Sequence, residues 1–218
     1  MFIELVYFSA AAAAFAAAFI YANLPTKWII GDDGPTLAHI KTARLVKIDK
    51  EREVDRTKTI TADEFLSQPS LVLAVRRPGC ILCRREAQRL SKLKGMLDKA
   101  GIRLVAVTHQ LKGVDAYKPY FDGDIYLDTK RTFFGPKERW MPIWIGLLRV
   151  NLWKYVFASV MDGLWGDLRG EGRLLGGVHL LTSDDLFYSY LEEEWGDKPD
   201  MGELEHVIET FAKHHKKE

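Results

Sequence analysis

The spacing of apolar residues predicts an α/β chain built around one strand–helix–strand unit. An apolar, largely β-branched run covers residues 71–75, and apolar residues then recur at helical spacing from Ala87 to Ala100. Gly101 follows where a helix C-cap is expected, and the apolar run 102–107 predicts a second buried strand. A strand, a helix and a further strand in this order predict the right-handed parallel unit of an α/β sheet.

Weaker patterns predict the elements before and after this unit. Residues 44–49 alternate as a strand, and Thr61 with Glu64 has the capping-box spacing that opens a short helix. We expect a short helix over 114–121 and a strand over 124–128. No internal repeat interrupts this order.

The C-terminal third is predicted to hold one strand and two helices. The strand covers 174–181, and a helix over 183–195 is expected to expose three glutamates at 192–194. A last helix contains apolar positions between 204 and 211, and the basic tail that follows suits a helix C-terminus.

The first 22 residues form an apolar segment with three open interpretations. Residues 5–22 hold no charged residue, which is just long enough to consider a membrane span, although the run is rich in alanine. Glu4 precedes the run and Lys27 follows it, which favours a retained segment with the domain in the cytosol over a cleaved signal. A membrane anchor, a secretory signal and a helix packed on the domain all remain open. The expected division is an apolar helix over 1–22, a linker over 23–35, the α/β domain over 36–212 and a basic tail over 213–218.

A second unusual segment is rich in tryptophan. It covers residues 140–165 and contains four of the six tryptophans: Trp140, Trp144, Trp153 and Trp165. Arg149, Lys154 and Asp162 interrupt it, so a full membrane span is not expected. We expect one or two inserted helices, which either pack over the sheet or lie at a membrane interface.

Composition narrows the function classes. The hydrophobic fraction of 47% and the charged fraction of 28% are those of a globular protein. The net charge of +1 gives no electrostatic case for nucleic-acid binding. The glycine-rich stretch 163–177 leads into a strand and not a helix, which excludes a dinucleotide-binding loop. These glycines are expected to let the backbone pass close to the cysteines.

Candidate chemistry is concentrated in Cys80-Ile81-Leu82-Cys83, a CxxC motif at the N-terminus of the central helix. Helix N-termini favour thiolates, and we expect Arg77 or Arg84 to stabilise the thiolate of Cys80 and Cys83 to resolve Cys80 once it is oxidised. His109, at the end of the second strand, is the best-placed histidine for proton transfer, and a solvated loop histidine without a catalytic role is the alternative. Structural zinc would need about four ligands, and two inert buried thiols are the other alternative.

Several separated motifs resemble the peroxiredoxin-like 2 family of redox-regulatory proteins. They are AVRRPGCILCRREA, LSKLKGMLDKAGIRLVAV, KPYFDGDIYLD, FFGP, LRGEGRLLGGV and EEEWGDK, in this order within residues 35–212. The resemblance implies the AhpC/TSA group and a thioredoxin-like three-layer sandwich with the CxxC as active site. We expect no cofactor, and the resemblance leaves open a cytoplasmic location, membrane association through the N-terminal helix, or secretion.

Two departures from related folds stand out. True peroxiredoxins carry a Pro-x-x-x-Thr-x-x-Cys pattern, but Leu73 holds the proline position here and Arg77 the threonine position. The cis-proline that thioredoxin folds usually place beside the thiols is absent, because no proline occurs between Pro142 and Pro199. Both departures predict slow peroxidase activity or altered substrate docking.

The expected function is reduction of peroxides or disulfides by Cys80 and Cys83, with thioredoxin or glutathione as reductant. Two alternatives stay open. One is a membrane-tethered redox sensor or interaction protein without turnover. The other, implied by a related branch of the family, is a lipid endoperoxide reductase of the prostaglandin F synthase type.

Overall fold

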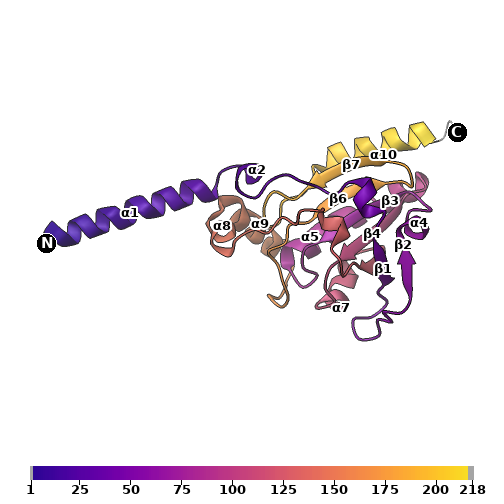
Figure 1. Ribbon diagram of the computed structural model, residues 1–218, viewed down its shortest axis with the longest axis horizontal. Coiled ribbons are helices and arrows are strands. Elements are labelled where there is room, and N and C mark those ends of the chain that lie inside the picture. Colours follow the sequence, from indigo (N-terminus) through magenta and orange to yellow (C-terminus); the bar gives the residue numbers. More distant parts are fainter. Residues whose placement is uncertain (1, 216–218) are drawn as a thin grey trace.

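The computed structural model describes residues 2–215 and contains a seven-stranded mixed sheet between layers of helices (Figure 1). The strand order is β2-β1-β5-β4-β3-β6-β7. The strands are β1 (Arg44–Lys47), β2 (Thr59–Thr61), β3 (Ser70–Val75), β4 (Arg103–Thr108), β5 (Asp124–Leu127), β6 (Gly177–Leu181) and β7 (Leu186–Leu191). The helices are α1 (Phe2–Ala22), α2 (Thr26–Ile29), α3 (Leu37–Ile40), α4 (Ala62–Phe65), α5 (Ile81–Ser91), α6 (Lys94–Lys99), α7 (Val114–Tyr117), α8 (Ile143–Leu148), α9 (Val150–Met161) and α10 (Met201–His215), with short 3-10 turns η1 (Lys118–Tyr120) and η2 (Thr132–Phe134).

The central unit confirms the predicted thioredoxin-like fold. Strands β3 and β4 are parallel and are joined through α5 and α6, while β6 pairs antiparallel with β3 and β7 antiparallel with β6. Helix α10 follows β7 and completes the β-α-β and β-β-α halves of a thioredoxin core. The β3–α5 junction, which carries the cysteines, lies at the carboxyl end of β3, between β4 and β6 in the sheet.

Two apolar cores cover the two faces of the sheet, so the domain is the expected three-layer sandwich. Alternate residues of β3 point to opposite faces. Leu71 packs with α5, α6 and α10, whereas Val72 packs with α3, α4 and η2. On the second face, Phe65 meets Tyr126 and Phe133 edge-on, with ring centroids 5.3 and 5.7 Å away.

The helix after the cysteines is shorter than predicted. The expected single helix is broken between α5 and α6 at residues 92 and 93. The Ser91 hydroxyl donates to the Ala87 carbonyl at 2.8 Å, and the Asp122 amide donates to that hydroxyl at 2.9 Å. A serine that bonds back onto its own helix competes with helical bonding and bends the helix.

The helix predicted over 183–195 is wrong, because this segment forms strand β7. Thr182 and Asp185 close a tight turn, with the Asp185 amide donating to Thr182 Oγ1 at 2.9 Å. The strand carries aromatic residues that favour β-structure, and Phe187 packs edge-on against Phe211 of α10. The expected solvated glutamates at 192–194 are also corrected, because Glu192 and Glu194 are buried.

The predicted linker over 23–35 contains α2 and is fastened to the domain. Ala22 is buried, the Asn23 side-chain amide donates to the Leu148 carbonyl at 3.0 Å, and Arg149 Nη2 donates to the Leu24 carbonyl at 3.1 Å. Helix α1 extends away from the domain as a separate rod (Figure 1). Among the residues described, no helix combines the length and apolar character that crossing a membrane requires.

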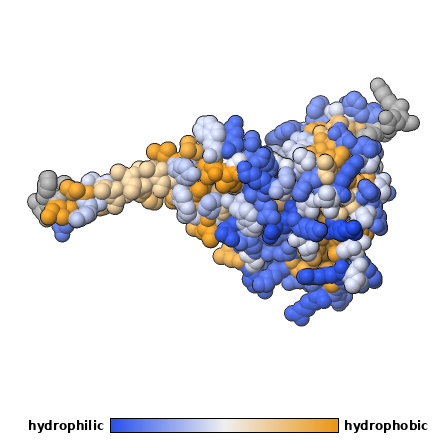
Figure 2. All heavy atoms as spheres, viewed as in Figure 1, coloured by the Kyte–Doolittle hydropathy of each residue, from blue (hydrophilic) through white to orange (hydrophobic). Residues whose placement is uncertain are grey.

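The tryptophan-rich segment forms the helix pair α8 and α9, as predicted. Both helices bury one side and expose large apolar side chains on the other, including Trp144, Leu147, Trp153 and Phe157. Apolar surface continues from this pair onto α1 in Figure 2. Helix α10 absorbs residues 213–215 of the predicted basic tail, and residues 216–218 lie outside the described part of the chain.

Candidate redox site

The two cysteines occupy the positions that the sequence predicts at the start of α5. Cys80 is the N-cap residue and Cys83 lies in the first turn, and the Arg84 amide donates to the Cys80 carbonyl at 3.0 Å. Both thiols are free and buried, with exposed fractions of 4% for Cys80 and 8% for Cys83. The free amides of the first helical turn therefore face Cys80.

The cation in contact with the sulfur is Arg76. Its Nη2 lies 3.7 Å from Cys80 Sγ, and its Nη1 donates to the Gly172 carbonyl at 2.9 Å. The guanidinium is buried, lies over the Trp195 ring at 5.8 Å, and its Nε is 3.5 Å from Glu192 Oε1. A buried guanidinium at this distance stabilises a thiolate more strongly than an exposed one would.

The arginines expected at the thiols have other contacts. Arg77 Nη1 donates to the Leu168 carbonyl at 3.2 Å, although its charge still lowers the pKa of Cys80. Arg84 Nη1 donates to the Trp165 carbonyl at 2.6 Å and its Nη2 lies 3.9 Å from Asp167. Arg84 thus holds the loop that passes the cysteines and does not touch a sulfur.

The two thiols differ in acidity. Hydrogen bonding from the Cys83 thiol is the largest cause that lowers the pKa of Cys80 well below its ordinary value, and the charges of Arg76 and Arg77 add to it against the cost of burial. The same hydrogen bond and burial raise the pKa of Cys83 well above its ordinary value. This order makes Cys80 the thiol that ionises first.

Glycines bring the loop before β6 against the cysteine turn. The Asp167 amide donates to the Gly79 carbonyl at 2.8 Å, and a Cβ on Gly166 would lie 2.4 Å from the Ile81 nitrogen. A Cβ on Gly176 would lie 2.0 Å from the Ala74 carbonyl oxygen. The structure therefore confirms that these glycines permit close backbone approach, a role that a side chain would prevent.

A groove of about 820 Å³ opens above Cys80. Arg76, Arg77 and Cys80 lie at its floor, and the loop 166–173 forms one side. The other side is formed by apolar side chains of α8 and α9, which are Ile143, Leu147, Leu152, Trp153 and Val156. The site thus combines a cationic thiol floor with an apolar wall, and it can admit a molecule much larger than hydrogen peroxide.

Comparison with known proteins places this arrangement in a family. A family model described as AhpC/TSA antioxidant enzyme matches residues 89–194. Peroxiredoxin-like 2A of Homo sapiens is 37% identical over 169 residues, which cover 76% of this chain and 72% of the human protein. The Danio rerio protein of the same name is 34% identical over 202 residues, covering 90% and 91%. The chain belongs to the peroxiredoxin-like 2 family. Among solved structures, peroxiredoxin Q from Xanthomonas campestris aligns over 81% of this chain and 94% of its own, with 14% identity and a TM-score of 0.49.

In this peroxiredoxin-like 2 protein, His109, the histidine that the sequence places best for proton transfer, contacts the backbone of Arg76 and not a cysteine. Its Nε2 is 3.0 Å from the Arg76 carbonyl, and its ring meets Phe134 edge-on at 5.5 Å. Burial lowers the pKa of His109, which favours the neutral ring. The contacts of His109 therefore fix the Arg76 backbone and do not involve a sulfur.

The sequence patterns predicted Arg77 or Arg84 at the Cys80 thiolate. The charge of Arg77 does lower the pKa of Cys80, but the patterns did not single out the contact with Arg76 or its partner Glu192. Glu192 Oε2 accepts from the Gly176 amide at 2.9 Å, and Oε1 accepts from the Gly196 amide at 3.1 Å and faces Arg76. Burial raises the pKa of Glu192, and the charge of Arg76 opposes that shift. The one local signal for this pair was the position of Arg76 directly after the buried strand. Glu192 gave no such signal, because it is remote from the cysteines in sequence.

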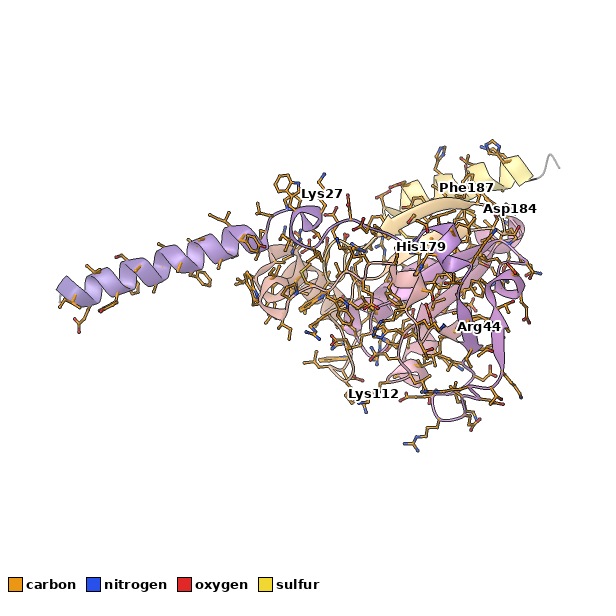
Figure 3. All side chains as sticks on the ribbon, in the orientation of Figure 1. Lys27, Arg44, Lys112, His179, Asp184 and Phe187 are labelled. Carbon is orange, nitrogen blue, oxygen red and sulfur yellow. The ribbon has the colours of Figure 1, made fainter. Side chains whose placement is uncertain are left out.

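Metal binding has no support in the residues described. Among residues 2–215, no group of three or more His, Cys, Asp or Glu side chains could hold a metal ion. His179 lies on β6 within the sheet (Figure 3), with Nδ1 3.0 Å from Ser189 Oγ. Burial lowers the pKa of His179 to about 3, so this histidine stays neutral inside the sheet.

Proposed function

We propose that this protein is a thiol-dependent oxidoreductase that reduces peroxides through Cys80, with Cys83 as the resolving thiol. The observation that carries the proposal is the Cys80 sulfur 3.7 Å from the buried Arg76 guanidinium, at the floor of an open groove. Membership of a family matched by an antioxidant-enzyme model supports thioredoxin-fold redox chemistry in general. The assignment to these two cysteines is our own.

The first step is attack of the Cys80 thiolate on one peroxide oxygen. A sulfur–oxygen bond forms as the oxygen–oxygen bond breaks, and the departing alkoxide takes a proton and leaves as an alcohol. Arg76 stabilises the thiolate before attack and lies beside the charge that moves onto oxygen. The product at Cys80 is a sulfenic acid.

In the second step, the Cys83 thiolate attacks the Cys80 sulfur. The disulfide forms, and the hydroxide that leaves is protonated to water. An external dithiol such as thioredoxin, or glutathione, then reduces the disulfide and restores both thiols. Because Cys83 lies in the first turn after Cys80, this bond needs little movement of the backbone.

The groove favours an organic peroxide over hydrogen peroxide. Its wall presents Leu147, Leu152 and Trp153, which would bury the apolar part of a substrate beside the thiol. Reduction of disulfides is the second candidate, because Arg77 stands where true peroxiredoxins carry the threonine that positions a peroxide. A redox sensor without turnover would use the same thiols with no substrate in the groove.

A steady-state assay separates these candidates. Hydrogen peroxide, cumene hydroperoxide and an oxidised model peptide are supplied in turn, with and without thioredoxin and its reductase. We expect thioredoxin-dependent turnover that is fastest with cumene hydroperoxide and is lost in Cys80→Ser. Turnover with the peptide alone would favour disulfide reduction, and stoichiometric oxidation without turnover would support the sensor.

We further propose that α1 and the outer sides of α8 and α9 rest on a phospholipid surface. Helix α1 exposes large apolar side chains along its length, and Tyr21 stacks on Trp144 of α8 at 6.0 Å. Lys27 lies where α1 joins the domain (Figure 3), next to the exposed Trp28. Basic and tryptophan side chains suit lipid headgroups, and lipid can cover several sides of a helix at once.

Vesicle sedimentation tests this location. The full chain is mixed with phosphatidylcholine vesicles containing phosphatidylserine, and a variant with Phe15, Phe19 and Ile20 all replaced by serine is the comparison. We expect the wild type to sediment with vesicles and the variant to stay in the supernatant. A wild type that ignores vesicles and forms a concentration-dependent dimer would assign the surface to a second copy. A chain in cells that begins near Asn23 would indicate a cleaved signal and export.

A further inference from the structure

A small cavity lies beside Cys83 and is separate from the groove above Cys80. Its volume is about 30 Å³, which is room for one or two water molecules. Polar side chains line it together with Cys83, namely Arg76, Glu86, Tyr190, Glu192 and Asp197. A polar cavity with this many partners meets the conditions for holding ordered water.

Glu86 is the unexplained group at this cavity. It lies one turn after Cys83 on α5 and is buried. Its Oε2 is 3.5 Å from Arg89 Nη1, but Oε1 is buried and has no hydrogen-bond partner among the described residues. A buried carboxyl oxygen without a partner is costly, so a function for it is expected.

The charges around Glu86 leave it able to exchange a proton near neutral pH. Burial raises its pKa to about 7, the positive charges of Arg89 and Lys198 oppose the shift, and the negative charges of Glu192 and Asp197 add to it. Tyr117 of α7 is within the electrostatic reach of both Glu86 and Cys83, and burial raises its pKa well above the ordinary value. The tyrosine therefore stays neutral while the glutamate titrates.

Glu192 and Asp197 are the other two carboxyls at the cavity, and both have hydrogen-bond partners. Asp197 Oδ2 accepts from the Tyr190 hydroxyl at 2.6 Å and from the Glu193 amide at 2.8 Å. Each oxygen of Glu192 accepts a backbone N–H, and one also faces the Arg76 guanidinium. Burial raises the pKa of Glu192, while the charge of Arg76 and the two amide hydrogen bonds oppose that shift and favour the carboxylate. Of these three carboxyls, Glu86 is the one with a buried oxygen that has no hydrogen-bond partner among the described residues.

We propose that Glu86 is the proton acceptor of Cys83, through water in this cavity. When Cys83 attacks oxidised Cys80, its thiol proton passes to the Glu86 carboxylate as the sulfur–sulfur bond forms and the group on Cys80 leaves with the electron pair. When the disulfide is reduced, the proton returns to the Cys83 sulfur. The Arg89 side of Glu86 is partly exposed and connects it to solvent. The inference rests on the proposed function only in taking Cys83 as the resolving thiol.

The test uses 5,5′-dithiobis(2-nitrobenzoic acid), so that it does not depend on peroxidase activity. Attack by Cys80 releases one coloured thiolate, and attack by Cys83 on the resulting mixed disulfide releases a second. Stopped-flow absorbance resolves the two releases in wild type, Glu86→Gln, Glu86→Asp and Glu192→Gln. Glu205→Gln, on the exposed side of α10, is the matched control.

We expect Glu86→Gln to slow the second release at least tenfold at pH 7 while the first changes less than twofold. The wild-type rate of the second release should rise with an apparent pKa near 7, the value to which burial raises Glu86, and this step should vanish in Glu86→Gln. Glu86→Asp should restore part of the rate, and Glu205→Gln should match wild type.

An unchanged second release in Glu86→Gln, or a retained step near pH 7, overturns the assignment of Glu86. Loss of the step in Glu192→Gln alone would assign the proton to Glu192 instead. If no second release occurs even in wild type, Cys83 does not resolve and this inference fails together with that part of the proposed function. A slowed second release in a protein that turns over no peroxide would leave Glu86 assigned and remove only the peroxidase proposal.

Discussion

The floor of the groove is formed by buried charged side chains, whereas its wall is formed by exposed apolar side chains. At the floor, Arg76 and Glu192 form a buried ion pair, and the backbone holds both, because Arg76 Nη1 donates to the Gly172 carbonyl and Glu192 Oε2 accepts from the Gly176 amide. At the wall, α8 and α9 expose large apolar side chains such as Trp153, which is 58% exposed. The usual distribution is therefore reversed at this groove: a charged pair is buried at the floor, and large apolar side chains are exposed at the wall.

This contrast indicates which region fixes the chemistry and which selects the substrate. Buried charges interact strongly and tolerate little change, because removing one partner leaves the other unpaired in a low-dielectric site. Exposed apolar side chains contribute area without strict geometry. Trp195 joins the two regions. The Arg76 guanidinium lies over its ring, and the ring also packs closely against Gly146 of α8, where an added Cβ would lie only 2.6 Å from it.

The largest effect is expected from Arg76→Met, which breaks the floor. Glu192 would lose its cation, and we expect the free energy of unfolding to fall by about 3–5 kcal/mol. The pKa of Cys80, now lowered by this arginine, should rise, and the pH midpoint of Cys80 alkylation should move upward by the same amount. Urea unfolding and iodoacetamide kinetics from pH 4 to 9 measure both. Arg85→Met, which changes a partly exposed arginine paired with Asp162, is the control and should shift neither property appreciably.

A second prediction concerns Glu86, whose buried carboxyl should make the free energy of unfolding depend on pH. Its pKa is near 4.5 in the unfolded chain and is raised to about 7 in the fold by burial, so folding favours its protonated form. That stabilisation is fully present below pH 4.5 and is lost as pH rises to 7, up to about 3 kcal/mol. Glu86→Gln, which stays neutral, should remove this decline. Parallel pH profiles of unfolding free energy in the two proteins would contradict it.

Gly166→Ala should loosen the contact between floor and loop with a smaller effect. The new Cβ would lie 2.4 Å from the Ile81 nitrogen, so the loop must move away from the cysteine turn. We expect a loss of about 1–3 kcal/mol, together with faster proton exchange of the Asp167 amide, which now bonds to Gly79. Gly95→Ala, in α6 with nothing near its Cβ, is the matched control and should stabilise by about 0.5–1 kcal/mol.

The smallest effect is expected at the wall. Leu147→Ser removes apolar area from the groove and should raise the KM for cumene hydroperoxide about fivefold, equivalent to about 1 kcal/mol. The kcat/KM for hydrogen peroxide, which has no apolar part, should stay the same. Phe157→Ser on α9 is exposed but does not line the groove, so it should change neither. Equal losses for both peroxides would show that the wall supports the site without selecting its substrate.

The sequence by itself determined the parts of this protein that depend on local order. The strand at 71–75, the cysteines before and within the first turn of the next helix, and the cap at Thr61 all rest on neighbouring residues and local periodicity. The thioredoxin-like fold followed from the same local unit and from motifs in fixed order. These features were predictable because each is stabilised within a few residues of itself.

Only the tertiary structure decided which charges surround the thiols. Arg76, Arg77 and Arg84 all lie within four residues of Cys80, yet only Arg76 meets its sulfur, because Glu192 and Gly172 hold it from far along the chain. The segment after residue 183 has helix-forming polar residues, but pairing with β6 and packing on α10 make it a strand and bury Glu192. Contacts between segments 100 residues apart carry no local signal, so burial and the resulting pKa values could come only from the fold.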